Sequence, residues 1–215
     1  MKTLPKTLTV FKNLIKKREY DEEKIIRYFI EKKNNDLNPE IKLKILEILK
    51  NLVKRAKIEF GMLIVYGWKR EWNKIYASIL DETQNLFETK DYNLGNVSLK
   101  KAIKIFTELR EFDGAILINK DGKILASGAY LINLNPLKAL EKLHKKGSDL
   151  SDAFGFKSKV HTRHIIAITT STILDETTVY TVSEENRIIR IYEKGEIVYS
   201  TFLPERKEIL EKIEE

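Results

Sequence analysis

The apolar positions in the first quarter of the chain recur at helical spacing. The segment 38–57 opens with Asn38 and Pro39, a good capping residue followed by the residue type favoured at the first helical position. Apolar residues then recur at steps of three and four, at Ile45, Leu46, Leu49, Leu52, Val53 and Ala56. The pattern predicts helices within residues 6–57. It leaves the partner of this apolar stripe open: the following domain, a neighbouring helix or another subunit.

From about residue 58 the pattern changes to a mixture of strands and helices. Runs rich in β-branched and aromatic residues predict strands within 58–67, 114–131 and 177–202, and the turn 119–122 would fold the second of these runs into a hairpin. Helical patterns cover 72–87, 98–111, 136–146, 165–173 and 204–215, and a polar loop is expected over 145–158.

Strands and helices that mix without strict alternation indicate an α/β fold. We expect a mixed, largely central β-sheet flanked by helices and preceded by an N-terminal helical extension. The extension would comprise residues 1–57, and the domain that carries the sheet would comprise residues 58–215.

Positive charge is concentrated in the N-terminal quarter. The chain has a formal net charge of +7, and residues 1–57 hold sixteen Lys or Arg against eight Asp or Glu. Such a segment favours contact with nucleic acid or another acidic surface, or forms a solvated lysine-rich helical face. Aromatic residues are few there and no nucleic-acid-binding motif is present, so nucleic acid is the weaker interpretation.

The composition narrows the possible chemistry. There is no cysteine, which excludes disulfide scaffolds, thiolate zinc sites and cysteine nucleophiles, and fits a reducing cytoplasm. No stretch approaches eighteen consecutive apolar residues, and the N-terminus lacks the pattern of a signal peptide. We therefore expect a cytoplasmic protein without membrane contact.

The first candidate for chemistry is Asp113, which precedes Gly114 and Ala115 at the start of a buried strand. Glycine at the second position permits unusual backbone angles or the close approach of a ligand. The same residues also suit an Asp-Gly turn before a strand.

A second candidate lies in the stretch His161 to Ile165, where two of the three histidines flank an arginine before an apolar run. If a helix starts here, its free N–H groups and positive dipole end, together with Thr162, Arg163 and His164, suit a polyphosphate. A metal pair of His161 and His164 and a surface capping cluster are the alternatives.

The third candidate is Ser183, Glu184 and Glu185, which follow an alternating strand. Carboxylates at a strand end can hold a divalent ion through oxygen ligands, or they are solvated charges.

Taken together, three stretches resemble a known family. They are "FDGAILINKDGKILASGAYL" (112–131), "HTRHIIA" (161–167) and "VYTVSEENRIIRIYEKGEI" (179–197). Their order and spacing are similar to those of the diadenylate cyclase domain, which joins two ATP molecules into cyclic di-AMP, and the resemblance covers roughly residues 58–200.

The resemblance implies an enzyme with ATP as substrate. Asp113 would activate the ribose 3′-hydroxyl or help to hold the metal, with Gly114 and Ala115 shaping the contact. It also implies three further groups of residues: Thr162, Arg163, His164 and Ser183 at the phosphates, Tyr130 and Leu131 at adenine, and Asp113, Glu184 and Glu185 at a divalent metal ion, Mn²⁺ or Mg²⁺. Each chain would supply half of the reaction centre, so a homo-oligomer with face-to-face sites is expected.

The chain departs from the family pattern at two positions. The family motif reads Gly-Thr-Arg-His-Arg, and here His161 and Ile165 replace the glycine and the final arginine. A non-catalytic regulator that binds ATP or cyclic di-AMP on the same fold is therefore the alternative function.

Overall fold

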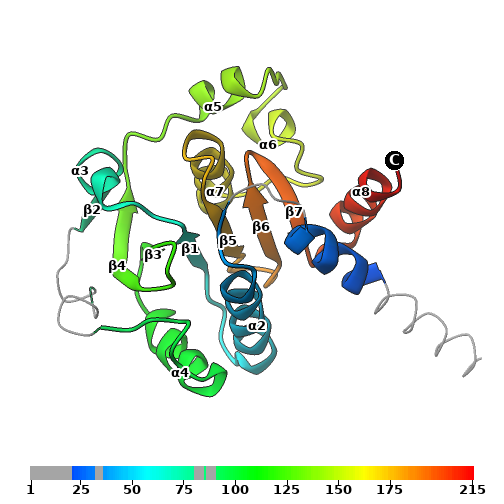
Figure 1. Ribbon diagram of the computed structural model, residues 1–215. Coiled ribbons are helices and arrows are strands. Elements are labelled where there is room, and N and C mark those ends of the chain that lie inside the picture. Colours follow the sequence, from blue (N-terminus) through cyan, green and yellow to red (C-terminus); the bar gives the residue numbers. More distant parts are fainter. Residues whose placement is uncertain (1–20, 32–35, 80–84, 86–90) are drawn as a thin grey trace, which may run out of the picture.

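The computed structural model (Figure 1) describes residues 21–31, 36–79, 85 and 91–215. Its centre is a seven-stranded sheet in the order β2-β4-β3-β1-β5-β6-β7. The strands are β1 (Met62–Tyr66), β2 (Ala77–Ile79), β3 (Ala115–Ile118), β4 (Ile124–Leu131), β5 (Thr178–Val182), β6 (Ile189–Glu193) and β7 (Glu196–Ser200). Strands β1 and β3 run parallel and the other neighbours are antiparallel. The predicted α/β fold with a mixed central sheet is confirmed.

Helices cover both faces of this sheet. They are α2 (Pro39–Arg55), η1 (Arg70–Trp72), α3 (Asn73–Tyr76), α4 (Leu99–Leu109), α5 (Pro136–Lys142), α6 (Leu150–Ala153), α7 (Thr162–Ile173) and α8 (Leu203–Glu214), and residues 21–31 are also helical. None of the helices in the described part of the chain combines the length and apolar character that a bilayer crossing requires.

Alternation along the strands divides the interior into two cores. In β1, Met62, Ile64 and Tyr66 face the core that contains α2 and α4, whereas Leu63 and Val65 face the core that contains α5, α6 and α7. Figure 1 shows α2 and α4 on one side of the sheet and α7 on the other. Successive strand side chains point to opposite faces, so a strand that is apolar at every position must be covered on both.

Helix α2 belongs to the first of these cores. Asn38 caps it by accepting a hydrogen bond from the Glu40 N–H at 2.8 Å, as its sequence predicts. The stripe that includes Ile45 and Leu49 is buried with side chains of the sheet and α4, so the partner that the sequence left open is this chain itself. The division of the chain at residue 57 stays a prediction.

Two local expectations were wrong. Residues 72–87 do not form one helix, because α3 ends at Tyr76 and Ala77–Ile79 pairs as β2 with the end of β4. Backbone pairing at the sheet edge outweighs helical periodicity here, and most of the remainder of that segment lies outside the described residues. The loop 145–158 also contains the short helix α6, which Asp149 caps through the N–H groups of the first turn.

Candidate active site at one edge of the sheet

Strand register brings the three candidate stretches to one edge of the sheet. Leu63 in β1 pairs with Ala115 in the parallel strand β3, and Ala115 pairs with Ala129 in β4. Met62 at the start of β1 pairs with Val182 at the end of β5. The residues that flank these pairs therefore lie at the same end of the strands, and 'edge' here means this row of strand ends. We call it the site edge, and it comprises Gly61, Asp113, Gly114, Tyr130, Leu131, Ser183 and the first turn of α7.

Asp113 lies exposed at this edge, just before β3. The following Gly114 has φ +97°, and a Cβ atom there would lie 2.6 Å from the carbonyl carbon of Gly128. A side chain at position 114 would therefore be both strained and sterically excluded. Glycine lets β3 and β4 approach closely, between an exposed Asp113 and a buried Ala115.

The first turn of α7 supplies a cation to the same edge. The Arg163 guanidinium lies directly over Gly61, where any Cβ atom would overlap it. Its Nη2 is 3.7 Å from the Glu184 carboxylate, and the side chain is partly exposed. Thr162 is exposed at the first helical position, and the His161 side chain caps none of the first-turn N–H groups. The helix start, which no side chain caps, and Arg163 together make the electrostatic potential at this edge more positive.

His164 is turned away from the edge and into the core. Its side chain is 4% exposed, and Nδ1 is 2.8 Å from the Tyr192 hydroxyl and 3.0 Å from the Thr181 hydroxyl. Burial, together with the charges of Arg190, Arg163 and His161, lowers the pKa of His164 from 6.5 to about 3. The imidazole is therefore neutral at physiological pH, and a direct phosphate contact by His164 stays a prediction.

Two of the three carboxylates predicted at the metal have a basic side chain beside them. Glu185 is 2.8 Å from Nε2 of the exposed His161, and Glu184 lies beside Arg163. Within the described ranges, no three Asp, Glu or His side chains converge closely enough to hold a metal ion. Metal binding by Asp113, Glu184 and Glu185 stays a prediction, whereas the alternative pair of His161 and His164 is separated into solvent and core.

The remaining predicted residues occupy the rim and the wall of the edge. Tyr130 is exposed at the end of β4, with Leu131 half-buried beside it, and Ser183 is buried just beyond β5. Ile165, where the family motif has arginine, is 7% exposed and packs in the core with α5, α6 and α7. The position that departs from the family pattern is therefore an interior position in this chain.

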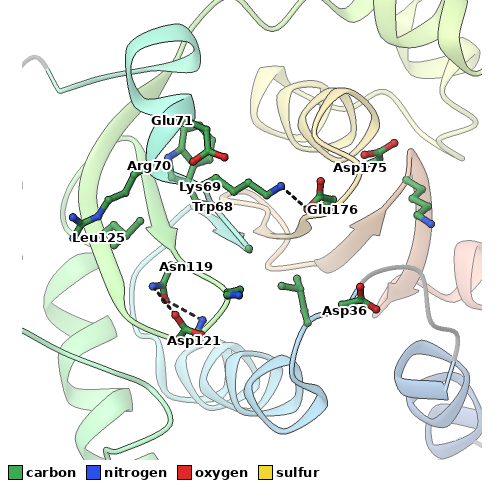
Figure 2. A pocket seen from close by; sticks show the side chains of 14 residues that line it. Asp36, Trp68, Lys69, Arg70, Glu71, Asn119, Asp121, Leu125, Asp175 and Glu176 are labelled. Atoms are coloured by element: carbon green, nitrogen blue, oxygen red, sulfur yellow. Dashed lines mark hydrogen bonds and ion pairs between the residues drawn. The ribbon is translucent and has the colours of Figure 1, made fainter.

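A cavity of about 770 Å³ lies at the opposite edge of the sheet (Figure 2). We call this the pocket edge; it includes Gly67 and Trp68 after β1, residues 119–121 between β3 and β4, and Asp175 and Glu176 before β5. Three of its charged side chains form ion pairs: Lys69 lies 2.7 Å from Glu176, and Asp175 accepts from Lys142 at 3.0 Å. None of the sequence-predicted site residues lines this cavity.

The sequence did not identify the residues that contact Arg163 and His164 from the sheet. Gly61 lies inside a predicted strand and gives no signal of its own, although it leaves room for the Arg163 guanidinium. Arg190 and Tyr192 alternate with apolar residues along β6 and contact His164 from the core side. Only the paired strands and the position of α7 identify them.

The chain was compared with solved structures and with curated proteins. The chain is similar to two solved structures. One is described as a hypothetical membrane spanning protein from Bacillus cereus. The match has 20% sequence identity and a TM-score of 0.46, and it covers 74% of this chain and 62% of that chain. The other is a double mutant of DacA from Staphylococcus aureus. The match has 20% sequence identity and a TM-score of 0.46, and it covers 81% of this chain and 93% of that chain. The chain spans less than two thirds of the Bacillus cereus protein. No curated protein matches it.

Residues 50–197 match the family described as DAC, the DisA bacterial checkpoint controller nucleotide-binding domain. This range contains β1 to β6, the first turn of α7 and every residue of the site edge. The chain therefore belongs to the DAC family of nucleotide-binding domains.

Proposed function

We propose that the protein is a diadenylate cyclase that condenses two ATP molecules into cyclic di-AMP and releases pyrophosphate. One observation carries the proposal. Asp113, the uncapped start of α7 with Arg163, and the carboxylates of Glu184 and Glu185 share one open edge within a DAC-family domain. An acid, a cation and free N–H groups at one place suit a hydroxyl nucleophile that attacks a phosphate.

The chemistry assigned to these residues is mainly positioning and charge neutralisation. The 3′-oxygen of each ATP forms a bond to the α-phosphorus of the other, and each bond to a pyrophosphate oxygen breaks, so that two pyrophosphates are released. Each hydroxyl proton passes to the Asp113 carboxylate or to solvent. The Asp113 carboxylate accepts a hydrogen bond from that hydroxyl and orients it. Arg163 and the first-turn N–H groups of α7 stabilise the charge on the phosphates, because such donors need no reorganisation during the reaction.

A divalent cation, Mn²⁺ or Mg²⁺, is part of this proposal. Mg²⁺ is usually held by one or two carboxylates together with substrate phosphates, so a full protein cage is not needed. Asp113 and Glu185, with Glu184 beside them, offer such carboxylates at the site edge. When bound there, the cation would neutralise part of the polyphosphate charge.

Two chains are needed for the reaction in this proposal. The site edge is open to solvent on its outer side, and Tyr130 at its rim is 37% exposed. An open edge with one acid and one cationic helix start can serve one ATP, and a second edge facing it would serve the other. We therefore propose a homo-oligomer with face-to-face sites.

The test is an ATP reaction with Mn²⁺ or Mg²⁺, separated by chromatography. Wild type is expected to produce cyclic di-AMP, and Asp113→Asn is expected to abolish the product. The matched control is Asp121→Asn, which changes an exposed aspartate at the opposite end of the same strand pair and should leave the rate unchanged. Intact ATP at every metal and enzyme concentration would disprove the proposal.

A nucleotide-binding regulator without turnover is the second candidate. The observation that favours it is Ile165, which is buried and apolar where the family motif has a cation. Losing a charge-assisted contact costs about 1.5–3 kcal/mol, which lowers a rate about ten- to a hundredfold if the contact acts in the transition state. Calorimetry that shows saturable ATP or cyclic di-AMP binding without product would support this candidate over the cyclase.

A further inference from the structure

A chain of buried polar contacts connects the C-terminal helix to the start of α7. Glu205, in the first turn of α8, accepts a hydrogen bond from Arg190 Nε at 2.7 Å and another from the Ser200 hydroxyl at 2.6 Å. Arg190 and Glu205 are each only 2% exposed. The guanidinium also lies against the rings of Phe156 and Phe202. This pair is therefore fixed from several sides inside the protein.

The same guanidinium reaches the imidazole behind the site edge. Arg190 Nη1 is 3.5 Å from His164 Nε2, at the long limit of a hydrogen bond. Arginine can only donate, so Nε2 of the neutral ring must accept, and the ring proton must sit on Nδ1. Nδ1–H then donates to the hydroxyl of Tyr192 or Thr181. The contacts thus select one tautomer and one orientation of His164.

His164 in turn fixes the first turn of α7. It is the third residue of the helix and follows Arg163 directly, so its ring position sets how the cation and the helix start meet the site edge. Two contacts, Glu205 to Arg190 and Arg190 to His164, thus connect an acid on α8 with the first turn of α7. The family match ends at residue 197, so Glu205 lies beyond it.

We infer that Arg190 and Glu205 are positioning residues: through His164 they fix the tautomer of the imidazole and the placement of the first turn of α7, on which ATP binding depends. The inference rests on the proposed function in its second half, because the start of α7 binds the triphosphate only if that function holds. Its first half, the tautomer, stands on the contacts alone.

The test compares two double variants of the full chain. Arg190→Met/Glu205→Leu removes both charges together, because replacing a buried ion pair by apolar residues is often close to neutral for stability. The matched control is Lys42→Met/Glu193→Leu. Lys42 and Glu193 form the other buried ion pair of β6, 2.8 Å apart and equally buried, at the pocket-edge end of the strand.

The first readout is the ¹⁵N spectrum of the imidazoles, in which His164 is assigned by elimination with His144→Gln and His161→Gln. Wild type and the control are expected to show a protonated Nδ1 and an unprotonated Nε2. Arg190→Met/Glu205→Leu is expected to shift the ring toward the Nε2–H tautomer. An unchanged Nδ1–H ring in that variant, or an Nε2–H ring in wild type, would overturn the inference.

The second readout is the KM for ATP beside kcat, with calorimetric binding of ATP as its equilibrium counterpart. Misplacing a binding group can cost up to about a hundredfold, and we expect KM to rise about tenfold in Arg190→Met/Glu205→Leu and to stay unchanged in the control. Equal KM values in both would overturn the positioning role.

Two outcomes separate this inference from the proposed function. If wild type makes no cyclic di-AMP, the proposed function fails, while the nitrogen shifts and the ATP affinity still decide the positioning role. If Arg190→Met/Glu205→Leu does not fold, Arg190→Lys serves instead. It keeps the charge beside Glu205 but loses the planar fork that reaches both partners, so the same shifts are expected with smaller size.

Discussion

The two edges of the sheet differ in how closely one cation at each is paired. At the pocket edge Lys69 lies 2.7 Å from Glu176 and also over the ring of Trp72, so its charge is matched within the chain. At the site edge Arg163 is 3.7 Å from Glu184, and the helix start behind it is uncapped by a side chain. Arg163 at the site edge is therefore less closely paired than Lys69 at the pocket edge.

Strand β6 has one buried ion pair near each of its ends. Arg190 near its first residue pairs with Glu205 and contacts His164 behind the site edge. Glu193 at its last residue pairs with Lys42 and accepts from Thr178 behind the pocket edge. One buried ion pair is linked to a candidate functional residue and the other only to structure, which makes their variants directly comparable.

The largest expected effect is the single variant Lys42→Met. It leaves Glu193 buried without its counter-charge, and breaking a buried pair on one side costs about 3–5 kcal/mol. Urea unfolding should show this loss, and adding Glu193→Leu should recover most of it. The KM for ATP of the folded fraction should not change. A rise in KM as large as that of Arg190→Met/Glu205→Leu would erase the distinction between the two ends of β6.

Next in size is Gly114→Ala, with Gly67→Ala as the equivalent change at the pocket edge. Both glycines have φ above +90°, but a Cβ at Gly114 meets backbone atoms at 2.6–2.9 Å, whereas at Gly67 the nearest atom is on the Leu37 side chain at 3.0 Å. We expect Gly114→Ala to lower the free energy of unfolding by about 2–4 kcal/mol and Gly67→Ala by about 1–2 kcal/mol. Thermal and urea unfolding measure both. Equal losses would show that the close approach of β3 and β4 adds nothing to the strain.

The smallest effect is a pH dependence that belongs to the site edge. The folded pKa of His164, about 3, lies below its ordinary 6.5, so between these values the unfolded chain binds a proton that the folded chain does not. The stability linked to the neutral ring is complete above pH 6.5 and is lost as the pH falls toward 3. We expect wild type to lose about 1 kcal/mol more than His164→Gln between pH 6.5 and 5.5.

The Tyr192 hydroxyl from β6 and the Thr181 hydroxyl from β5 contact this ring, and the charges of Arg190 from β6, Arg163 from α7 and His161 just before α7 act on it. A matched variant at the pocket edge, Lys69→Met, should keep the wild-type pH dependence, since no histidine lines that cavity. Parallel stability curves for wild type and His164→Gln would contradict the buried neutral state.

Local sequence signals were sufficient where the structure is local. The Asn38–Pro39 start of α2 and the turn at 119–122 form as predicted, because each depends on residues a few positions apart. The local pattern over 72–87 predicts a helix, and it cannot show β2, whose pairing partner at Ala129 to Leu131 is distant in sequence.

The candidate site divides in the same way. The sequence places Asp113 and Ser183 at strand ends, and the registers of β1 and β5 then bring those ends together. Which way His164 turns depends on Tyr192, 28 residues later, and on the arginine beside it. A charged residue such as Arg190 within an alternating strand is usually solvent-facing, so its burial against α8 could not be read from the pattern.

Arg190 and Glu193 stand three positions apart on β6, and their partners, Glu205 and Lys42, stand outside opposite ends of the family match at 50–197. A fragment trimmed to that match would retain both buried charges and discard both counter-charges. Each loss is worth about 3–5 kcal/mol, against about 5–15 kcal/mol for the stability of a whole domain. The family boundary is thus a boundary of shared sequence, whereas the unit that can fold by itself must extend at least from Lys42 to Glu205.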